Sequence, residues 1–191
     1  MKADTRVTVP QAGFGLIEVM VSMAILGIAL LGLIILQAKA QQIAMDTYQR
    51  SQSLIILDDM VSRLYANAIA AQSCYLTDRF AKLPGEWSDT DTEYRGCSDA
   101  SNRDLAEWNA SLQGTGERIT ENNQTRIVGA ILAARGCVTQ DPTDPDLLHV
   151  SVAWQGLHPM PAPANPCAAD RFDAADLRRV VSVPVRLSHW K

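Results

Sequence analysis

Two kinds of residue in this sequence could do chemistry: one carboxylate inside an apolar run, and four cysteines that follow the run. From Phe14 to Leu36 the chain has 23 residues with no charge other than Glu18. A helix of that length reaches about 35 Å, enough to cross the ~30 Å apolar core of a bilayer. A carboxylate inside a membrane-spanning segment is costly, and it usually has a partner or a function. Glu18 is therefore the first candidate site.

Three interpretations of the apolar run compete. It could be a cleaved secretory signal that ends at Ala40, where "QAKA" offers a small-x-small site. However, the apolar core of such signals usually spans only about 7–15 residues. A plain single-span anchor explains the length but leaves Glu18 unexplained. The third interpretation treats the order Gly13, Phe14 and then Glu18 as a processing signal.

The stretch "GFGLIE" resembles the processing motif of type IV prepilins and their relatives. The resemblance implies that a prepilin peptidase cuts on the cytoplasmic side after Gly13 and methylates the new amine of Phe14. Residues 1–13 are then a cleaved leader, whose two basic residues suit a cytoplasmic N-terminus.

Cleavage at this point creates a partner for Glu18. The new ammonium group on Phe14 lies four positions before Glu18, so the two charges share one helix face. Within one chain or between neighbours, the amine can neutralise the carboxylate, and this predicts that Glu18 docks the subunit in an assembly. The alternative is that Glu18 reaches the lipid headgroups from near the end of the helix.

The four cysteines all lie after the apolar run, which favours an oxidising compartment and two disulfides. Three pairings are possible. We expect the neighbours to pair, Cys74 with Cys97 and Cys137 with Cys167, because these bonds tie down the two least regular regions. Each bond would stabilise the fold by roughly 3–4 kcal/mol in the loop-entropy model. The main rival pairs Cys74 with Cys167 and Cys97 with Cys137.

Other functional classes find little support. The net charge is −4 and the basic residues form no stripe, so nucleic-acid binding is not expected. His149, His158 and His189 are scattered, without the spacing of zinc ligands. "DPTDPD" (residues 141–146) has carboxylates for Ca²⁺ but lacks the glycine and final Glu of an EF-hand loop, which favours a solvated turn. We predict no catalytic, metal or cofactor-binding residues, and no enzyme.

The helical pattern continues well beyond the apolar run. No proline occurs between Leu36 and Pro84, and apolar residues then recur at three and four positions (Leu57, Met60, Val61, Leu64, Tyr65, Ala68 and Ile69). Such a stripe indicates an amphipathic helix with one face on a globular domain. The sequence therefore predicts a single helix of about 55–60 residues, from Phe14 to near Ala71.

The rest of the chain predicts a short helix and a small sheet. The helix is expected across residues 101–114, with Asn102 or Asp104 near the cap and Gly114 as the stop. Three runs have the character of strands: residues 125–138, 147–156 and 177–190, the last with Pro184 at an edge or bulge. The predicted class is α+β, a long N-terminal helix packed on a small antiparallel meander with disulfide-tied loops. This is also the plan of pilins.

The predicted organisation has four parts. A leader (1–13) precedes a transmembrane or fibre-core helix (14–36), its amphipathic continuation (37–72) and a periplasmic globular domain (73–191). The stretch "YQRSQSLIILDDMVSRLYAN", with "HVSVAWQG" and "RRVVSVPVRL" near the C-terminus, resembles the PilV subgroup of minor pilins, also called type IV pilus modification proteins.

That resemblance implies a low-copy subunit that helps to initiate pilus assembly in a minor-pilin complex at the tip. Its implied partners are other minor pilins, the major pilin, the prepilin peptidase, the inner-membrane assembly machinery and the lipid bilayer. It implies location in the inner membrane and then in the fibre, with adhesion and twitching motility as dependent processes. The alternatives are a minor pseudopilin of type II secretion and, from another class, a secreted or anchored binding domain or hydrolase cleaved after Ala40.

Overall fold

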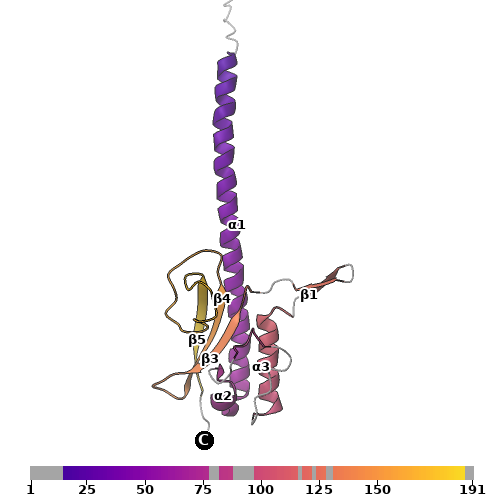
Figure 1. The fold of residues 1–191 in the computed structure, drawn as a ribbon, viewed down its shortest axis with the longest axis vertical. Coiled ribbons are helices and arrows are strands. Elements are labelled where there is room, and N and C mark those ends of the chain that lie inside the picture. Colours follow the sequence, from indigo (N-terminus) through magenta and orange to yellow (C-terminus); the bar gives the residue numbers. More distant parts are fainter. Residues whose placement is uncertain are drawn as a thin grey trace, which may run out of the picture. The chain divides into compact units, whose positions relative to one another are not determined.

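The computed structural model describes residues 15–77, 82–87, 97–115, 118–121, 124–127 and 131–187 of the 191-residue chain. The chain divides into two compact units, residues 1–43 and 44–191, which we call the N-terminal unit and the globular unit. Helix α1 (Leu16–Ala66) contributes residues to both units, and every other helix and strand belongs to the globular unit (Figure 1).

The long helix is shorter than predicted. The sequence predicts one helix to near Ala71, whereas the 51-residue α1 ends before Asn67 and a seven-residue helix, α2 (Ala68–Cys74), follows. Asn67 lies at the break with φ −121° and ψ 43°, and its side-chain amide donates to Asp104, 37 residues away. The break thus lies at a residue whose side chain is held by a part of the chain distant in the sequence, and the local pattern did not show it.

Three antiparallel strands form the main sheet, in the order β3 (Arg135–Gln140), β4 (Leu147–Gln155) and β5 (Arg178–Arg186). The predicted strands at 147–156 and 177–190 are confirmed as β4 and β5, although residues 188–190 lie outside the described part of the chain. Pro184 lies in β5 at the edge of this sheet, where a missing N–H donor is tolerated.

The predicted strand at residues 125–138 is wrong as a single strand. Its beginning belongs to β2 (Gln124–Ile127), which pairs with β1 (Arg118–Glu121) in a separate two-stranded sheet, and its end belongs to β3. A turn precedes β3, where Ala133 has a φ of +51° that a strand does not accommodate. The sequence analysis did not predict β1.

Helix α3 (Asp99–Leu112) confirms the predicted helix but begins two residues earlier than the predicted range of 101–114, and its cap is not Asn102 or Asp104. The reason is Ser98, whose side chain accepts a hydrogen bond from a backbone N–H of the first turn and so caps the helix. Gly114 has a φ of +70° and follows the end of the helix, as predicted.

One core joins α1, α3 and one face of the main sheet. Its buried side chains include Leu57, Met60 and Leu64 from α1, Leu105, Trp108 and Leu112 from α3, and Val138, Leu148, Val150, Val152 and Val185 from the sheet. Gly136 allows β3 to approach α3, because a Cβ there would lie 2.3 Å from the Trp108 ring. The predicted α+β class, a helix packed on a small antiparallel meander with two disulfides, is confirmed.

Two members of the predicted apolar stripe are not part of this core. Tyr65 and Ile69 are 57% and 97% exposed. Tyr65 lies about 100° further round the helix than the fully buried Leu64, and Ile69 follows the break at Asn67.

Candidate functional site: the N-terminal segment and the globular unit

Glu18 lies in the first turn of α1 and is exposed. Its backbone is helical, with its N–H donating to the Gly15 carbonyl at 3.0 Å and its own carbonyl accepting from the Ser22 hydroxyl at 2.7 Å. Together with Val19, Ser22, Met23 and Leu26, Glu18 lines a shallow, mostly apolar hollow on the helix surface. A carboxylate in such apolar surroundings is costly at membrane depth and usually has a partner or a function.

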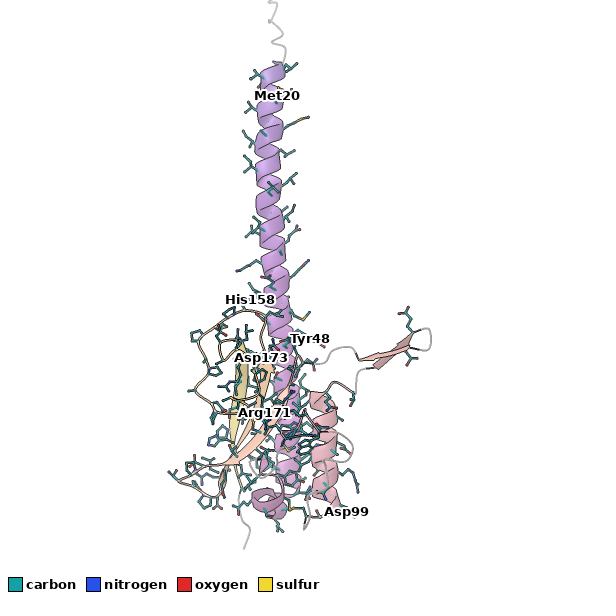
Figure 2. The ribbon with its side chains drawn as sticks, viewed as in Figure 1. Met20, Tyr48, Asp99, His158, Arg171 and Asp173 are labelled. Carbon is teal, nitrogen blue, oxygen red and sulfur yellow. A yellow bond between two sulfur atoms is a disulfide. The ribbon has the colours of Figure 1, made fainter. Side chains whose placement is uncertain are left out.

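The apolar run exposes its side chains all round the helix (Figure 2). The large apolar residues between Leu16 and Leu36 are 46–78% exposed, and Met20 is one of them at 62%. By length and composition α1 can cross a membrane. A surface this apolar requires lipid or protein from outside the chain to cover it.

The other two residues of the predicted processing site, Gly13 and Phe14, lie outside the described residues. The cleavage after Gly13, the methylation of Phe14 and the pairing of its amine with Glu18 therefore stay predictions.

The two disulfides join neighbours in the sequence. Cys74 pairs with Cys97 and Cys137 pairs with Cys167, with Cα–Cα distances of 5.7 and 5.9 Å. The first bond ties the end of α2 to the residue before the α3 cap. The second ties β3 to the loop between β4 and β5.

A polar network that the sequence analysis missed joins the end of α1 to α3. The Arg63 guanidinium donates to Asp59 at 3.0 Å, to Asp104 at 2.9 Å and to Glu107 at 2.7 Å. Asp104 also accepts hydrogen bonds from the Tyr75 hydroxyl and from the Asn67 side chain. Only the Asp59–Arg63 spacing, four positions along a helix, could have signalled this network.

The network perturbs two pKa values. Burial alone would lower the pKa of Arg63, but its hydrogen bonds to Asp59, Glu107 and Asp104 raise it above its ordinary value. Burial, and then the contact with Asp104, raises the pKa of Tyr75. Both groups therefore keep their protons at any physiological pH, which suits a structural joint between α1 and α3 rather than proton transfer.

In the aspartate-rich turn between β3 and β4, the carboxylates of Asp141 and Asp144 bond to other residues of the globular unit. Asp141 accepts hydrogen bonds from the Thr143 hydroxyl at 2.6 Å, the Thr143 N–H at 2.8 Å and the Asp144 N–H at 3.2 Å, and its other oxygen lies 3.2 Å from His149. The Thr143 hydroxyl contributes most to holding the pKa of Asp141 well below its usual range. Asp144 pairs with Arg186. Within the described residues, no group of three or more His, Cys, Asp or Glu side chains comes together to hold a metal ion.

The N-terminal segment of the chain matches a protein-family model. Residues 10–34 match the family model of the prokaryotic N-terminal methylation motif. This segment includes Gly13, Phe14, Glu18 and most of the exposed apolar run. This motif is typical of type IV pilin-like and pseudopilin-like prepilins. No curated protein and no solved structure matches the chain.

Prepilin-like proteins are processed by a prepilin peptidase and assemble with pilins. They are typically structural subunits without enzymatic activity. The motif and the apolar helix together indicate a prepilin-like protein that is anchored in the inner membrane.

Proposed function

We propose that this prepilin-like protein is a minor pilin of a type IV pilus, of the PilV subgroup, that helps to initiate assembly in a minor-pilin complex at the tip. In this proposal residues 1–13 are removed, residues 14–36 span the inner membrane and later enter the fibre core, residues 37–72 continue the helix, and residues 73–191 lie in the periplasm. The observation that carries the proposal is Glu18, the single carboxylate of the apolar run (residues 14–36), which is exposed in α1 and overlaps the methylation motif.

Glu18 is proposed to pair with the amine of Phe14, in its own chain or in a neighbour. An unpaired carboxylate at membrane depth costs about 2.5–3.5 kcal/mol on insertion scales. Neutralisation by an amine removes that cost and sets the axial register of the subunit. No other carboxylate is available in the described part of the N-terminal unit.

The processing step is tested by mass spectrometry of the protein purified from membranes. The expected N-terminus is Phe14 with one methyl group on its amine. A mature chain that starts at Gln41 would instead support the signal-peptide alternative and would overturn the prepilin processing.

The docking step is tested with Glu18→Gln, which keeps the size of the side chain and removes its charge. Processing should persist, while recovery of partner pilins with the protein should fall at least about tenfold. Ser22→Ala, one turn further along the same helix face, serves as the control and should recover partners normally. Undiminished recovery with Glu18→Gln contradicts the pairing.

The machine in which the subunit works is tested by identifying the proteins that co-purify with it. Type IV pilus subunits support the proposal. Components of type II secretion would assign the protein as a minor pseudopilin, which shares the N-terminal anchor.

A further inference from the structure

The globular unit contains a groove between α1, the edge of the main sheet and the loop that follows β4. We call it the α1–β5 groove. It has a volume of about 340 Å³ and is lined chiefly by Asp46, Arg50, Trp154, Met160, Arg179 and Val181. All of these residues lie in the globular unit.

The floor of the groove is apolar. Trp154 of β4 is 4% exposed and Val181 of β5 is half-buried, yet both line the groove. Met160, on the loop that follows β4, also lines the groove and is 55% exposed. An apolar floor beside an exposed apolar side chain fits a side chain of another protein better than a small polar solute.

Within the described residues, the charged side chains around this floor form no ion pairs. Asp46 and Arg50 lie four positions apart on α1, a spacing at which such side chains commonly pair. Neither makes an ion pair or a side-chain hydrogen bond within the described residues. The Arg179 guanidinium donates to the backbone carbonyls of Asp176, Arg178 and His158, and no described carboxylate pairs with it.

Other arginines of the same unit are neutralised internally. Arg63 contacts three carboxylates, Arg135 pairs with Glu86 at 2.7 Å, and Arg186 pairs with Asp144 at 2.7 Å. The groove therefore differs from these sites in presenting two guanidinium groups to whatever enters it. Asp46, which is half-buried at the same rim, disfavours a bare phosphate or sulfate as the occupant.

The wall that carries Met160 is held in place. The backbone N–H of Met160 donates to the Asp176 carbonyl at 2.8 Å. Arg178, which is only 4% exposed, donates to the carbonyls of Pro163, Asn165 and Cys167, and Cys167 is bonded to Cys137 on β3 (the loop also carries His158, labelled in Figure 2). A wall ordered in advance loses little conformational entropy when a partner binds.

From the charge and shape of this site we propose that the α1–β5 groove binds a segment of a neighbouring pilin-like subunit that presents an apolar side chain next to a carboxylate. The apolar side chain would cover Trp154 and Val181, and the carboxylate would neutralise Arg50 and Arg179. This proposal rests on the proposed function, because it takes the occupant from the same assembly.

The test reverses one charge in the full-length protein. Arg50 is exposed and makes no side-chain hydrogen bond or ion pair within the described residues, so Arg50→Glu should leave folding intact, as measured by thermal unfolding. Arg103→Glu makes the same charge reversal at an exposed position on α3 that also makes no described contact. Arg50→Glu should lower the recovery of pilin subunits from membranes at least about tenfold, and Arg103→Glu should change it less than about twofold.

A photo-reactive amino acid in place of Met160 gives a second measurement. Its cross-link should map to a partner segment that contains a carboxylate, and reversing that charge in the partner should restore assembly with Arg50→Glu. Normal recovery with Arg50→Glu, or cross-links to phospholipid alone, would contradict the binding of a neighbouring subunit in the α1–β5 groove. Either result would leave the proposed function intact. If the unaltered protein is processed at Phe14 but recovers no pilin subunit, the proposed function fails and this inference fails with it.

Discussion

The two parts of helix α1 differ in where their apolar side chains find cover. In the N-terminal unit the large apolar residues up to Leu36 remain at least 46% exposed. In the globular unit the same helix buries one face, with Met60 and Leu64 at 0% exposure against the sheet and α3. Within the described residues, the globular part of α1 packs on the protein core, whereas the apolar N-terminal part has no such cover.

This difference separates stability from assembly. The globular unit has its own core, two disulfides and internal ion pairs, so its folding depends on residues within it. The N-terminal unit offers an apolar surface and Glu18, and gains nothing from them within the described chain. Changes in the N-terminal unit should therefore alter membrane binding and assembly, while changes in the globular unit should alter the free energy of unfolding.

The largest expected effect comes from replacing residues 1–36 with a cleavable secretion signal. The protein should move completely from the membrane fraction to the soluble periplasmic fraction, because the apolar surface that requires lipid is gone. Thermal unfolding of the product should remain cooperative, since the core lies in residues 44–191. A product that stays with the membrane, or that does not fold, would contradict the assignment of membrane binding to the N-terminal unit and of folding to the globular unit.

A matched pair of leucines on α1 tests the same comparison by one substitution. Leu64 is fully buried and Leu30 is 52% exposed. Leu64→Ala should lower the free energy of unfolding by up to about 5 kcal/mol, because it removes buried contacts and leaves a cavity. Leu30→Ala should leave the unfolding of the globular unit unchanged. Denaturant titration of both variants in detergent measures the difference, and equal effects would contradict the separation.

The fold could be predicted where its signals are local. The apolar run and the start of the apolar stripe predict most of α1, and the alternation of residues 147–155 predicts β4, because each signal lies within a short stretch of sequence. The break at Asn67 and the turn at Ala133 could not be predicted. The Asn67 side chain bonds to Asp104, which is distant in the sequence, and no residue near Ala133 indicates that its φ is positive.

The candidate site could likewise be predicted only where its residues lie close together in the sequence. The methylation motif is a short linear pattern, so Gly13, Phe14 and Glu18 can be recognised directly. The Arg63 network joins residues 41 and 44 positions apart, and the α1–β5 groove joins α1 to β5. Such sites exist only after α3 and the sheet have packed on α1, because no local pattern brings these charges together.

The disulfide between Cys137 and Cys167 allows a smaller test within the globular unit. Replacing both cysteines by alanine should lower the free energy of unfolding by about 3–4 kcal/mol in the loop-entropy model. The loss should appear in denaturant titration without a change in membrane association, since neither residue belongs to the N-terminal unit. A loss of membrane association with normal unfolding would contradict the division of roles.

The smallest expected effect concerns pH and the turn at Asp141. Hydrogen bonds from Thr143, and then from His149, hold the pKa of this carboxyl well below its usual range. A carboxyl with a lowered pKa in the folded state stabilises the fold above its ordinary pKa of about 4, and this contribution is lost as the pH falls further. Asp141→Asn should therefore unfold at a lower temperature than the unaltered protein at pH 7, with the difference shrinking between about pH 4 and pH 2.

The control for this prediction is Asp173→Asn, at an exposed aspartate that has no partner within the described residues. Its unfolding temperature should follow that of the unaltered protein at each pH. The N-terminal unit has Glu18 as its sole described carboxylate, so a pH response of unfolding that disappears in Asp141→Asn belongs to the globular unit. A response that persists in Asp141→Asn and disappears in Glu18→Gln would mean that the two units fold as one.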